Sequence, residues 1–289
     1  MGKYPAKPGM WLSQLALRES SFFPIYAEVP GEAGGWGCRK LATAGLTAIV
    51  RNRHVGSVAL GLPPTIHACL FDLDGVITQT ARVHAQAWKQ VFDELLKARG
   101  QEPFDQVEDY DTYVDGKPRD AGVHDFLASR NIQLADNKVE AIAERKDHLF
   151  LHLIHQHGVQ TYEGTIRYIH AARAASKKVA VVSSSKHTTE VLHAAKLEGL
   201  FDAQVDGNDA EREHLEGKPA PDTYLKAAHI LNAQPKEAAV YEDALAGVQA
   251  GRAGGFGRVI GVDCACQAEA LYAHGADVVV KDLADLLAK

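Results

Sequence analysis

The stretch Phe71 to Thr78, Phe-Asp-Leu-Asp-Gly-Val-Ile-Thr, constrains this chain more than any other. It follows a short apolar run from Ile66 that begins after two prolines and is typical of a buried strand. Asp72 and Asp74 come where this strand should end, and residues two apart in extended backbone project to the same side. Two carboxylates in one small volume repel each other unless a proton or a cation compensates them. The motif therefore predicts a site for a hard divalent cation, with Mg²⁺ as the expected ion, and a polar loop after a strand is the alternative.

Composition favours a globular enzyme-sized protein with no nucleic-acid or membrane partner. The 289 residues suit one large or two small domains, and 46% of them are hydrophobic. A net charge of -6 argues against non-specific nucleic-acid binding. No apolar run approaches the ~18 residues of a membrane span. Four cysteines are too few for a disulfide-stapled scaffold, so a reducing, cytoplasmic setting is expected. Cys264 and Cys266 lack a second pair at zinc-site spacing, and Cys69 fits a core position.

Residues 1–62 differ from the rest of the chain. Prolines and glycines interrupt any long periodicity there, and basic residues outnumber acidic ones. The segment lacks the compact apolar core of a secretory signal, and a transit-type presequence is the weaker alternative. We expect a poorly ordered extension or residues upstream of the natural start, and no function is predicted for it.

From Pro63 onward, strand and helix patterns alternate. Strands are expected at 66–71, 178–182, 238–241, 258–262 and 277–280, and helices at 80–99, 139–157, 166–175, 189–197, 221–231, 244–252, 267–274 and 283–287. This alternation indicates an α/β fold, a doubly wound parallel sheet with a Rossmann-like core. The mostly helical block at 82–158 interrupts the alternation and is predicted to be an inserted cap. The core would then comprise residues 63–81 and 159–289.

Three further polar clusters follow predicted strands or precede a predicted helix. They are Ser183-Ser184-Ser185-Lys186, Gly217-Lys218-Pro219-Ala220-Pro221-Asp222 and Glu242-Asp243. Each has a simpler interpretation, because serines cap helices, loop lysines are usually solvated, and acids favour helix N-termini. In open α/β sheets, however, ligands bind beyond the carboxyl ends of the strands. We therefore expect these side chains to share one crevice with the two aspartates, equipped to hold Mg²⁺ and a phosphoryl group together.

The motifs DLDGVIT, SSSK, GKPAPD and EDALAGVQAG, in this order, resemble the haloacid dehalogenase-like superfamily of phosphotransferases over residues 63–289. The position of the cap and the segment from Thr80 to Trp88 look like the beta-phosphoglucomutase-type branch. The resemblance implies that Asp72 is the nucleophile that becomes an aspartyl phosphate. It implies that Asp74 is the general acid and base. Asp74 also favours phosphatase or mutase chemistry, because ion pumps and dehalogenases of this superfamily lack that second acid.

The resemblance also implies the remaining ligands. Mg²⁺ would be held by Asp72, Asp243 with help from Glu242, and the backbone carbonyl of Asp74. The phosphate and substrate contacts implied are Ser183, Ser184, Lys186, Lys218, the cap residue Arg119, and the hinge-side pair Thr80 and His84. For Arg119, a surface ion pair with Asp120 or Asp115 is the alternative, and for His84 an incidental position on a polar helix face.

Two residues depart from the pattern of the resembled branch. Gln79 stands where the common motif has an aspartate, and Asp115 stands where the cap carries a lysine. An acid in place of a base near a sugar phosphate weakens the mutase assignment more than the phosphoryl-transfer chemistry. The cap-helix pair His148 and His152 lacks a third metal ligand, so surface positions are expected.

Three functions remain open. The first is a Mg²⁺-dependent sugar phosphomutase that interconverts beta-glucose 1-phosphate and glucose 6-phosphate. The second is a phosphatase of a small phosphorylated metabolite. The third is a catalytically silent binding module, against which the complete set of site residues argues. A small phosphorylated sugar is the expected partner, and the protein is expected to be a monomer.

Overall fold

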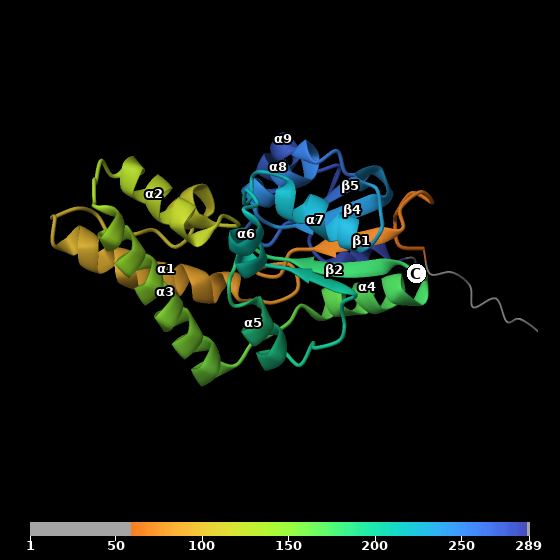
Figure 1. The fold of residues 1–289 in the computed structure, drawn as a ribbon, viewed down its shortest axis with the longest axis horizontal. Helices are drawn as coiled ribbons and strands as arrows, with labels where there is room; N and C mark the ends of the chain where they lie inside the picture. Colours follow the sequence, from red (N-terminus) through yellow and green to blue (C-terminus); the bar gives the residue numbers. More distant parts are fainter. Residues whose placement is uncertain (1–58, 288–289) are drawn as a thin grey trace, which may run out of the picture. The chain divides into compact units, whose positions relative to one another are not determined.

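The computed structural model describes residues 59–287, and the predicted extension at 1–62 lies outside the described residues up to position 58. One sheet of six parallel strands has the order β3-β2-β1-β4-β5-β6 (Figure 1). The strands are β1 (Ala68–Phe71), β2 (Lys178–Val182), β3 (Ala203–Val205), β4 (Ala238–Glu242), β5 (Arg258–Val262) and β6 (Val278–Val280). In the register, Phe71 of β1 lies beside Val181 on one side and Tyr241 on the other. The carboxyl ends of β2, β1 and β4 therefore lie side by side.

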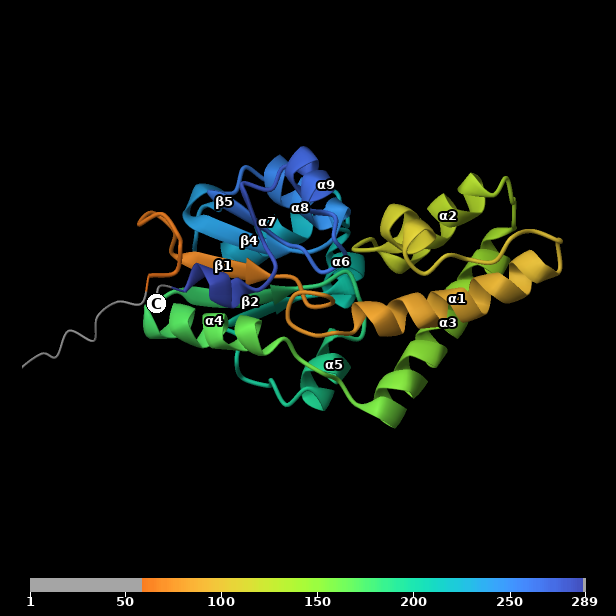
Figure 2. The ribbon, with the colours of Figure 1, turned by 180° about the vertical axis from the view of Figure 1, so that it is seen from behind.

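Helices cover both faces of the sheet, which confirms the predicted doubly wound α/β fold (Figures 1 and 2). On one face pack α4 (Glu163–Ala174), α5 (Thr188–Ala194) and the 3-10 helix η3 (Leu283–Leu286), and on the other α7 (Asp222–Ile230), α8 (Leu245–Ala253) and α9 (Ala268–His274). Successive side chains of a strand point to opposite faces. Accordingly, Cys69 and Phe71 pack on the first face, and Ala68 and Leu70 on the second.

A helical unit is inserted between β1 and β2. It comprises α1 (Ala81–Lys97), the π-helix η1 (Tyr110–Val114), α2 (Arg119–Ser129) and α3 (Asp136–His157). It has an aromatic core of its own, in which Phe92 stacks on Trp88 with ring centroids 5.0 Å apart and meets Phe126 at 4.2 Å. Helix α1 begins at Ala81 and α3 ends at His157, and the division of the chain at residues 62, 82 and 158 stays a prediction.

Some short elements differ from the expectation. The sequence does not predict β3 or α6 (Gly207–Glu213), and the helix expected at 283–287 is the 3-10 helix η3. Another 3-10 helix, η2 (Pro235–Glu237), precedes β4. Strand β3 consists of Ala-Gln-Val, so it lacks the run of β-branched residues that made the equally short edge strand Val278–Val280 predictable. Within residues 59–287, none of the helices combines the length and the apolar character needed to cross a bilayer.

Candidate active site

The end of β1 fixes the two aspartates of the first motif. The Asp72 N–H donates to the Tyr241 carbonyl at 2.9 Å, so pairing with β4 continues one residue beyond the strand. The chain then turns, and the Gly75 N–H donates to the Thr78 carbonyl at 2.7 Å. Gly75 has φ +99°, and a Cβ there would lie 1.7 Å from a carboxylate oxygen of Asp243. Glycine is therefore required for the turn to pass this close to the acid that follows β4.

Behind Asp72 lies a buried group of opposite charges. The Lys218 ammonium, 2% exposed, lies 2.5 Å from Asp72 Oδ1 and 2.7 Å from Glu242 Oε1. The Tyr224 hydroxyl donates to Glu242 at 2.7 Å, and the Val182 carbonyl accepts from Lys218 at 3.1 Å. Burial opposes the charged form of Lys218, but the two carboxylates outweigh it and raise the pKa of this lysine. The ammonium therefore stays charged beside the predicted nucleophile.

Three carboxylates form a candidate metal centre. Oxygens of Asp72, Glu242 and Asp243 lie within 4.8 Å of one another, and all three residues are buried. Burial raises the pKa of Asp243, and the nearby Asp115 and Asp72 carboxylates raise it further. Asp243 Oδ1 is buried and has no hydrogen-bond partner among residues 59–287. An orphaned carboxylate oxygen in an acidic cluster fits a hard cation such as Mg²⁺, which prefers oxygen ligands. The Asp74 side chain lies outside this cluster.

Adding Mg²⁺ is expected to raise the melting temperature. At a hundred times its Kd, an ion that binds only the folded state adds about 2.7 kcal/mol, or roughly 5–10 °C. The gain should grow from about pH 5 to about pH 8. Burial holds the pKa of Asp243 above its unfolded value, so the metal-free protein loses stability as pH rises through that pKa. Magnesium would bind the ionised form and offset this loss. Differential scanning fluorimetry would measure both trends, and an undiminished shift in Asp243→Asn would place the ion elsewhere.

Asp74 lies in a different environment, on the side of α1. Its carboxylate accepts a hydrogen bond from the Thr80 hydroxyl, and His84 Nε2 lies 3.3 Å from Oδ1. The imidazole stacks on Phe150 with centroids 3.9 Å apart. Burial raises the pKa of Asp74, but His84 and Thr80 outweigh burial and bring it to about 2. Burial and the Lys146 charge lower the pKa of His84. The predicted pair Thr80 and His84 is thus brought to the predicted acid and base.

The serine cluster after β2 joins the inserted unit to the core. Ser183 Oγ lies 3.4 Å from Asp74 Oδ2 and accepts the Ser185 N–H at 3.0 Å. The Ser184 hydroxyl donates to the Gly116 carbonyl at 2.8 Å, so it contacts the loop at 115–118 that joins η1 to α2, here called the cap loop. At Gly116, φ is +67° and a Cβ would lie 2.6 Å from the Ala244 methyl group. The cap loop is therefore seated directly against the core.

Lys146 is one of the charged pocket residues that the sequence reasoning missed, and its neighbour Asp147 is another. Lys146 is 5% exposed, and its ammonium lies 5.1 Å from the Trp88 ring centroid and 5.2 Å from that of Phe150. Burial lowers the pKa of Lys146, against the raising effect of Asp147 and Asp74. A signal exists in the sequence, because Lys146 interrupts the apolar stripe of α3 that buries Val139, Ala143, Phe150 and Leu153.

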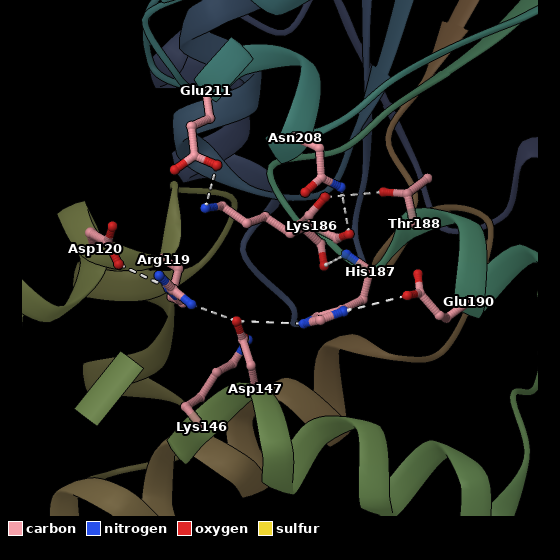
Figure 3. A network of polar contacts seen from close by, with 11 residues as sticks. Arg119, Asp120, Lys146, Asp147, Lys186, His187, Thr188, Glu190, Asn208 and Glu211 are labelled. Carbon is pink, nitrogen blue, oxygen red and sulfur yellow. Dashed lines mark hydrogen bonds and ion pairs between the residues drawn. The ribbon is translucent and has the colours of Figure 1, made fainter. Parts of the chain in front are cut away.

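The remaining predicted residues lie on the outer wall. Arg119 donates from Nη1 to Asp147 at 2.7 Å and from Nε to Asp120 at 2.8 Å, so the ion pair with Asp120, the alternative interpretation of this residue, is present (Figure 3). Lys186 pairs with the exposed Glu211 at 2.8 Å. His148 and His152 are exposed, as expected.

A cavity of about 60 Å³ lies among the residues described above. Its lining includes Asp72, Asp74, Ser183, Arg119, Lys146 and Asp115. Lys218, Glu242 and Asp243 do not line it and lie behind Asp72. Asp115 is 8% exposed, and burial with the nearby Asp111 and Glu242 charges raises its pKa. The acid that departs from the resembled pattern therefore faces the same cavity as the predicted nucleophile.

Comparison with known proteins identifies the family of this chain. The family model of haloacid dehalogenase-like hydrolases matches residues 66–255. A Mycobacterium bovis protein named beta-phosphoglucomutase is 47% identical over 251 residues, which cover 81% of this chain and 96% of that protein. A Thermotoga maritima protein named phosphorylated carbohydrates phosphatase is 28% identical over 221 residues, covering 75% of this chain and 94% of that protein.

The chain belongs to the haloacid dehalogenase-like hydrolase family, and it is an enzyme of the phosphomutase or phosphatase type. A solved structure agrees on the fold. The crystal structure of a beta-phosphoglucomutase from Clostridium difficile matches with a TM-score of 0.65 and 24% identity, covering 76% of this chain and 93% of that chain. The resemblance inferred from the four motifs is thereby confirmed.

Proposed function

We propose that this enzyme is a Mg²⁺-dependent sugar phosphomutase that converts beta-glucose 1-phosphate to glucose 6-phosphate through an aspartyl phosphate at Asp72. The observation that carries the proposal is the placement of two aspartates with opposite surroundings on one cavity. Asp72 lies 2.5 Å from the Lys218 ammonium, and Asp74 is held by Thr80 and His84. A paired carboxylate suits a nucleophile, and a carboxylate held by a hydroxyl and an imidazole suits proton transfer. The relative named beta-phosphoglucomutase supports the substrate.

In the first half-reaction, an Asp72 oxygen forms a bond to phosphorus while the bond from phosphorus to the leaving oxygen breaks. Asp74, which has a pKa of about 2 and is ionised in the free protein, gives that leaving oxygen the proton that it takes from the acceptor hydroxyl in the other half-reaction of the cycle. In the second half-reaction, ionised Asp74 takes the proton of the acceptor hydroxyl as this oxygen bonds to phosphorus and the Asp72 acyl phosphate breaks. Lys218 and the Ser183 hydroxyl stabilise the phosphoryl oxygens. Mg²⁺ held by Asp72, Asp243, Glu242 and the Asp74 carbonyl would neutralise part of the phosphoryl charge.

The cap decides which acceptor is used. The contact of Ser184 with Gly116 seats the cap loop on the core and leaves a cavity too small for a free hexose bisphosphate. The cap must therefore open to admit substrate and close to exclude water, which favours a sugar hydroxyl as the acceptor. Arg119 and Lys186 would bind the phosphate that does not react, since guanidinium matches phosphate geometry. A cytoplasmic, monomeric enzyme is part of the proposal.

Product analysis tests the proposal. Purified protein with Mg²⁺, beta-glucose 1-phosphate and catalytic glucose 1,6-bisphosphate is expected to yield glucose 6-phosphate without free phosphate. Rapid release of free phosphate would instead support a phosphatase, the second candidate, which the Thermotoga maritima relative favours. A lack of turnover with this substrate and with a panel of phosphate esters would support the third function, a catalytically silent binding module.

A further inference from the structure

One carboxylate of the inserted unit lies close to nitrogen atoms from three segments of the chain. Asp147 of α3 accepts from Arg119 Nη1 at 2.7 Å, and its oxygens lie 3.5 Å from Lys146 Nζ and 3.4 Å from His187 Nε2 (Figure 3). Arg119 begins α2, whereas His187 belongs to the core loop that follows β2. Asp147 is therefore in contact with both the cap and the core.

The contacts of Asp147 are internal rather than solvated. Its side chain is 16% exposed, as is that of His187. His187 Nε2 is buried and has no hydrogen-bond partner in the part of the chain described, and the Asp147 carboxylate is 3.4 Å from it. Burial raises the pKa of Asp147, but the neighbouring His187, Lys146 and Arg119 outweigh burial and lower this pKa. Asp147 is thus ionised at neutral pH.

This charge separates two cations that would otherwise repel each other. Arg119 and Lys146 line the same cavity, and the Arg119 charge lowers the pKa of Lys146. Asp147 compensates both and leaves Arg119 Nη2 without a hydrogen bond among residues 59–287. The second partner of Arg119, Asp120, has a side chain that is 60% exposed, and such surface pairs contribute little.

We propose that Asp147 is a positioning residue that orients Arg119 and Lys146 toward the anionic end of the substrate that does not react. Its contact with His187 completes this arrangement only when the cap lies against the core. The inference rests on the proposed function, because it takes a sugar phosphate with a non-reacting phosphate as the ligand. The opposite role, in which Asp147 competes with that phosphate for Arg119, predicts tighter binding when the carboxylate is removed.

Calorimetric binding of glucose 6-phosphate in the presence of Mg²⁺ tests the role. Asp147→Ala is expected to weaken binding roughly 10- to 100-fold, the loss typical of one charge-assisted hydrogen bond. Asp147→Asn, which keeps an acceptor oxygen for Arg119, should fall between the alanine variant and the wild type. The matched control is Asp120→Asn, which removes a charge from the same guanidinium and should stay within about twofold of wild type.

Acetyl phosphate, a small phosphoryl donor with no second anionic end, reports on Asp72 alone. Its hydrolysis should change less than about threefold in every variant, which separates a positioning role from a folding defect. If Asp147→Ala also loses acetyl phosphate hydrolysis, its weaker binding could come from a folding defect. The binding of glucose 6-phosphate by Asp147→Asn is then the deciding measurement. His187→Ala should weaken binding, and the double variant with Asp147→Ala should be no worse than Asp147→Ala by itself.

Binding that is unchanged or tighter in Asp147→Ala would overturn the proposal, as would an equal loss in Asp120→Asn. The results distinguish a wrong positioning role for Asp147 from a wrong function for the enzyme. If the wild type binds glucose 6-phosphate but interconverts no sugar phosphate, the proposed function is wrong and the comparison of variants still tests Asp147. If the wild type is a mutase and Asp147→Ala binds glucose 6-phosphate as tightly as the wild type, only the positioning role is wrong.

Discussion

Asp72→Asn is expected to abolish phosphoryl transfer and to lower turnover by about 10⁴-fold or more. The asparagine keeps the size of the side chain, but its amide is not a nucleophile toward phosphorus. Incubation with acetyl phosphate and Mg²⁺ should add one phosphoryl group to the wild-type protein, measured by intact mass spectrometry, and none to the variant. The adduct should be lost with hydroxylamine, which cleaves acyl phosphates. A stable adduct on another residue would contradict the mechanism.

The matched comparison for this result is Asp74→Asn. Acetyl phosphate has a good leaving group that needs no acid, so the Asp74 variant should still become phosphorylated at Asp72. Transfer to a sugar hydroxyl needs the base, and we expect it to slow by roughly 10²- to 10⁴-fold. Loss of phosphorylation in both variants would mean that the two aspartates act as one unit rather than in separate roles.

Much of the site could be predicted from the sequence because strand register places it. The motifs that follow β1, β2 and β4 contain residues 72, 183 and 243, and these strands are neighbours with aligned ends. In a parallel sheet this geometry follows from the alternation of strands and helices, which the sequence displays. Lys218 follows no strand. Its cluster was expected in the shared crevice because it precedes a predicted helix, and its contact with the nucleophile came from the family resemblance.

What the sequence could not predict depends on contacts between distant segments. The pairing of Asp147 on α3 with His187 after β2 has no local pattern, because the two residues meet only where the cap and the core come together. The same holds for Ser184, expected at the phosphate and found in contact with the Gly116 carbonyl. Lys146 is different, since its position on the apolar stripe of α3 was available from helical periodicity alone.

The buried charges around Lys218 contribute to stability as well as to chemistry. Lys218 is 2% exposed and compensates both Asp72 and Glu242, so its removal leaves two buried carboxylates without a cation. We expect Lys218→Met to lower the free energy of unfolding by about 3–5 kcal/mol at neutral pH in the absence of metal. Transfer activity should be lost as well, because a phosphoryl group on Asp72 would lose the cation that contacts this carboxylate.

The pH dependence of the lower stability of Lys218→Met identifies the cause of that lower stability. Burial raises the pKa of Asp72, and Lys218 opposes that shift, so the methionine variant should raise this pKa further. When a carboxyl group has a higher pKa in the folded than in the unfolded state, the protein loses stability as pH rises through the folded-state pKa. The deficit measured by urea unfolding should therefore widen from about pH 5 to about pH 8. A pure packing defect would give the same deficit at both values.

Lys226→Met is the matched control for this substitution. Lys226 lies on α7, near Lys218 in the sequence, and pairs with Glu213 at 2.6 Å, but both side chains are partly exposed. An exposed ion pair of this kind contributes about 0–1 kcal/mol, so the control should unfold almost as the wild type does. If Lys218→Met were as stable as Lys226→Met at about pH 8, the carboxylates behind Asp72 would need no cation. Lys218 would then not be needed to stabilise the fold around Asp72, and only kinetic measurements could support its role in binding the phosphoryl oxygens.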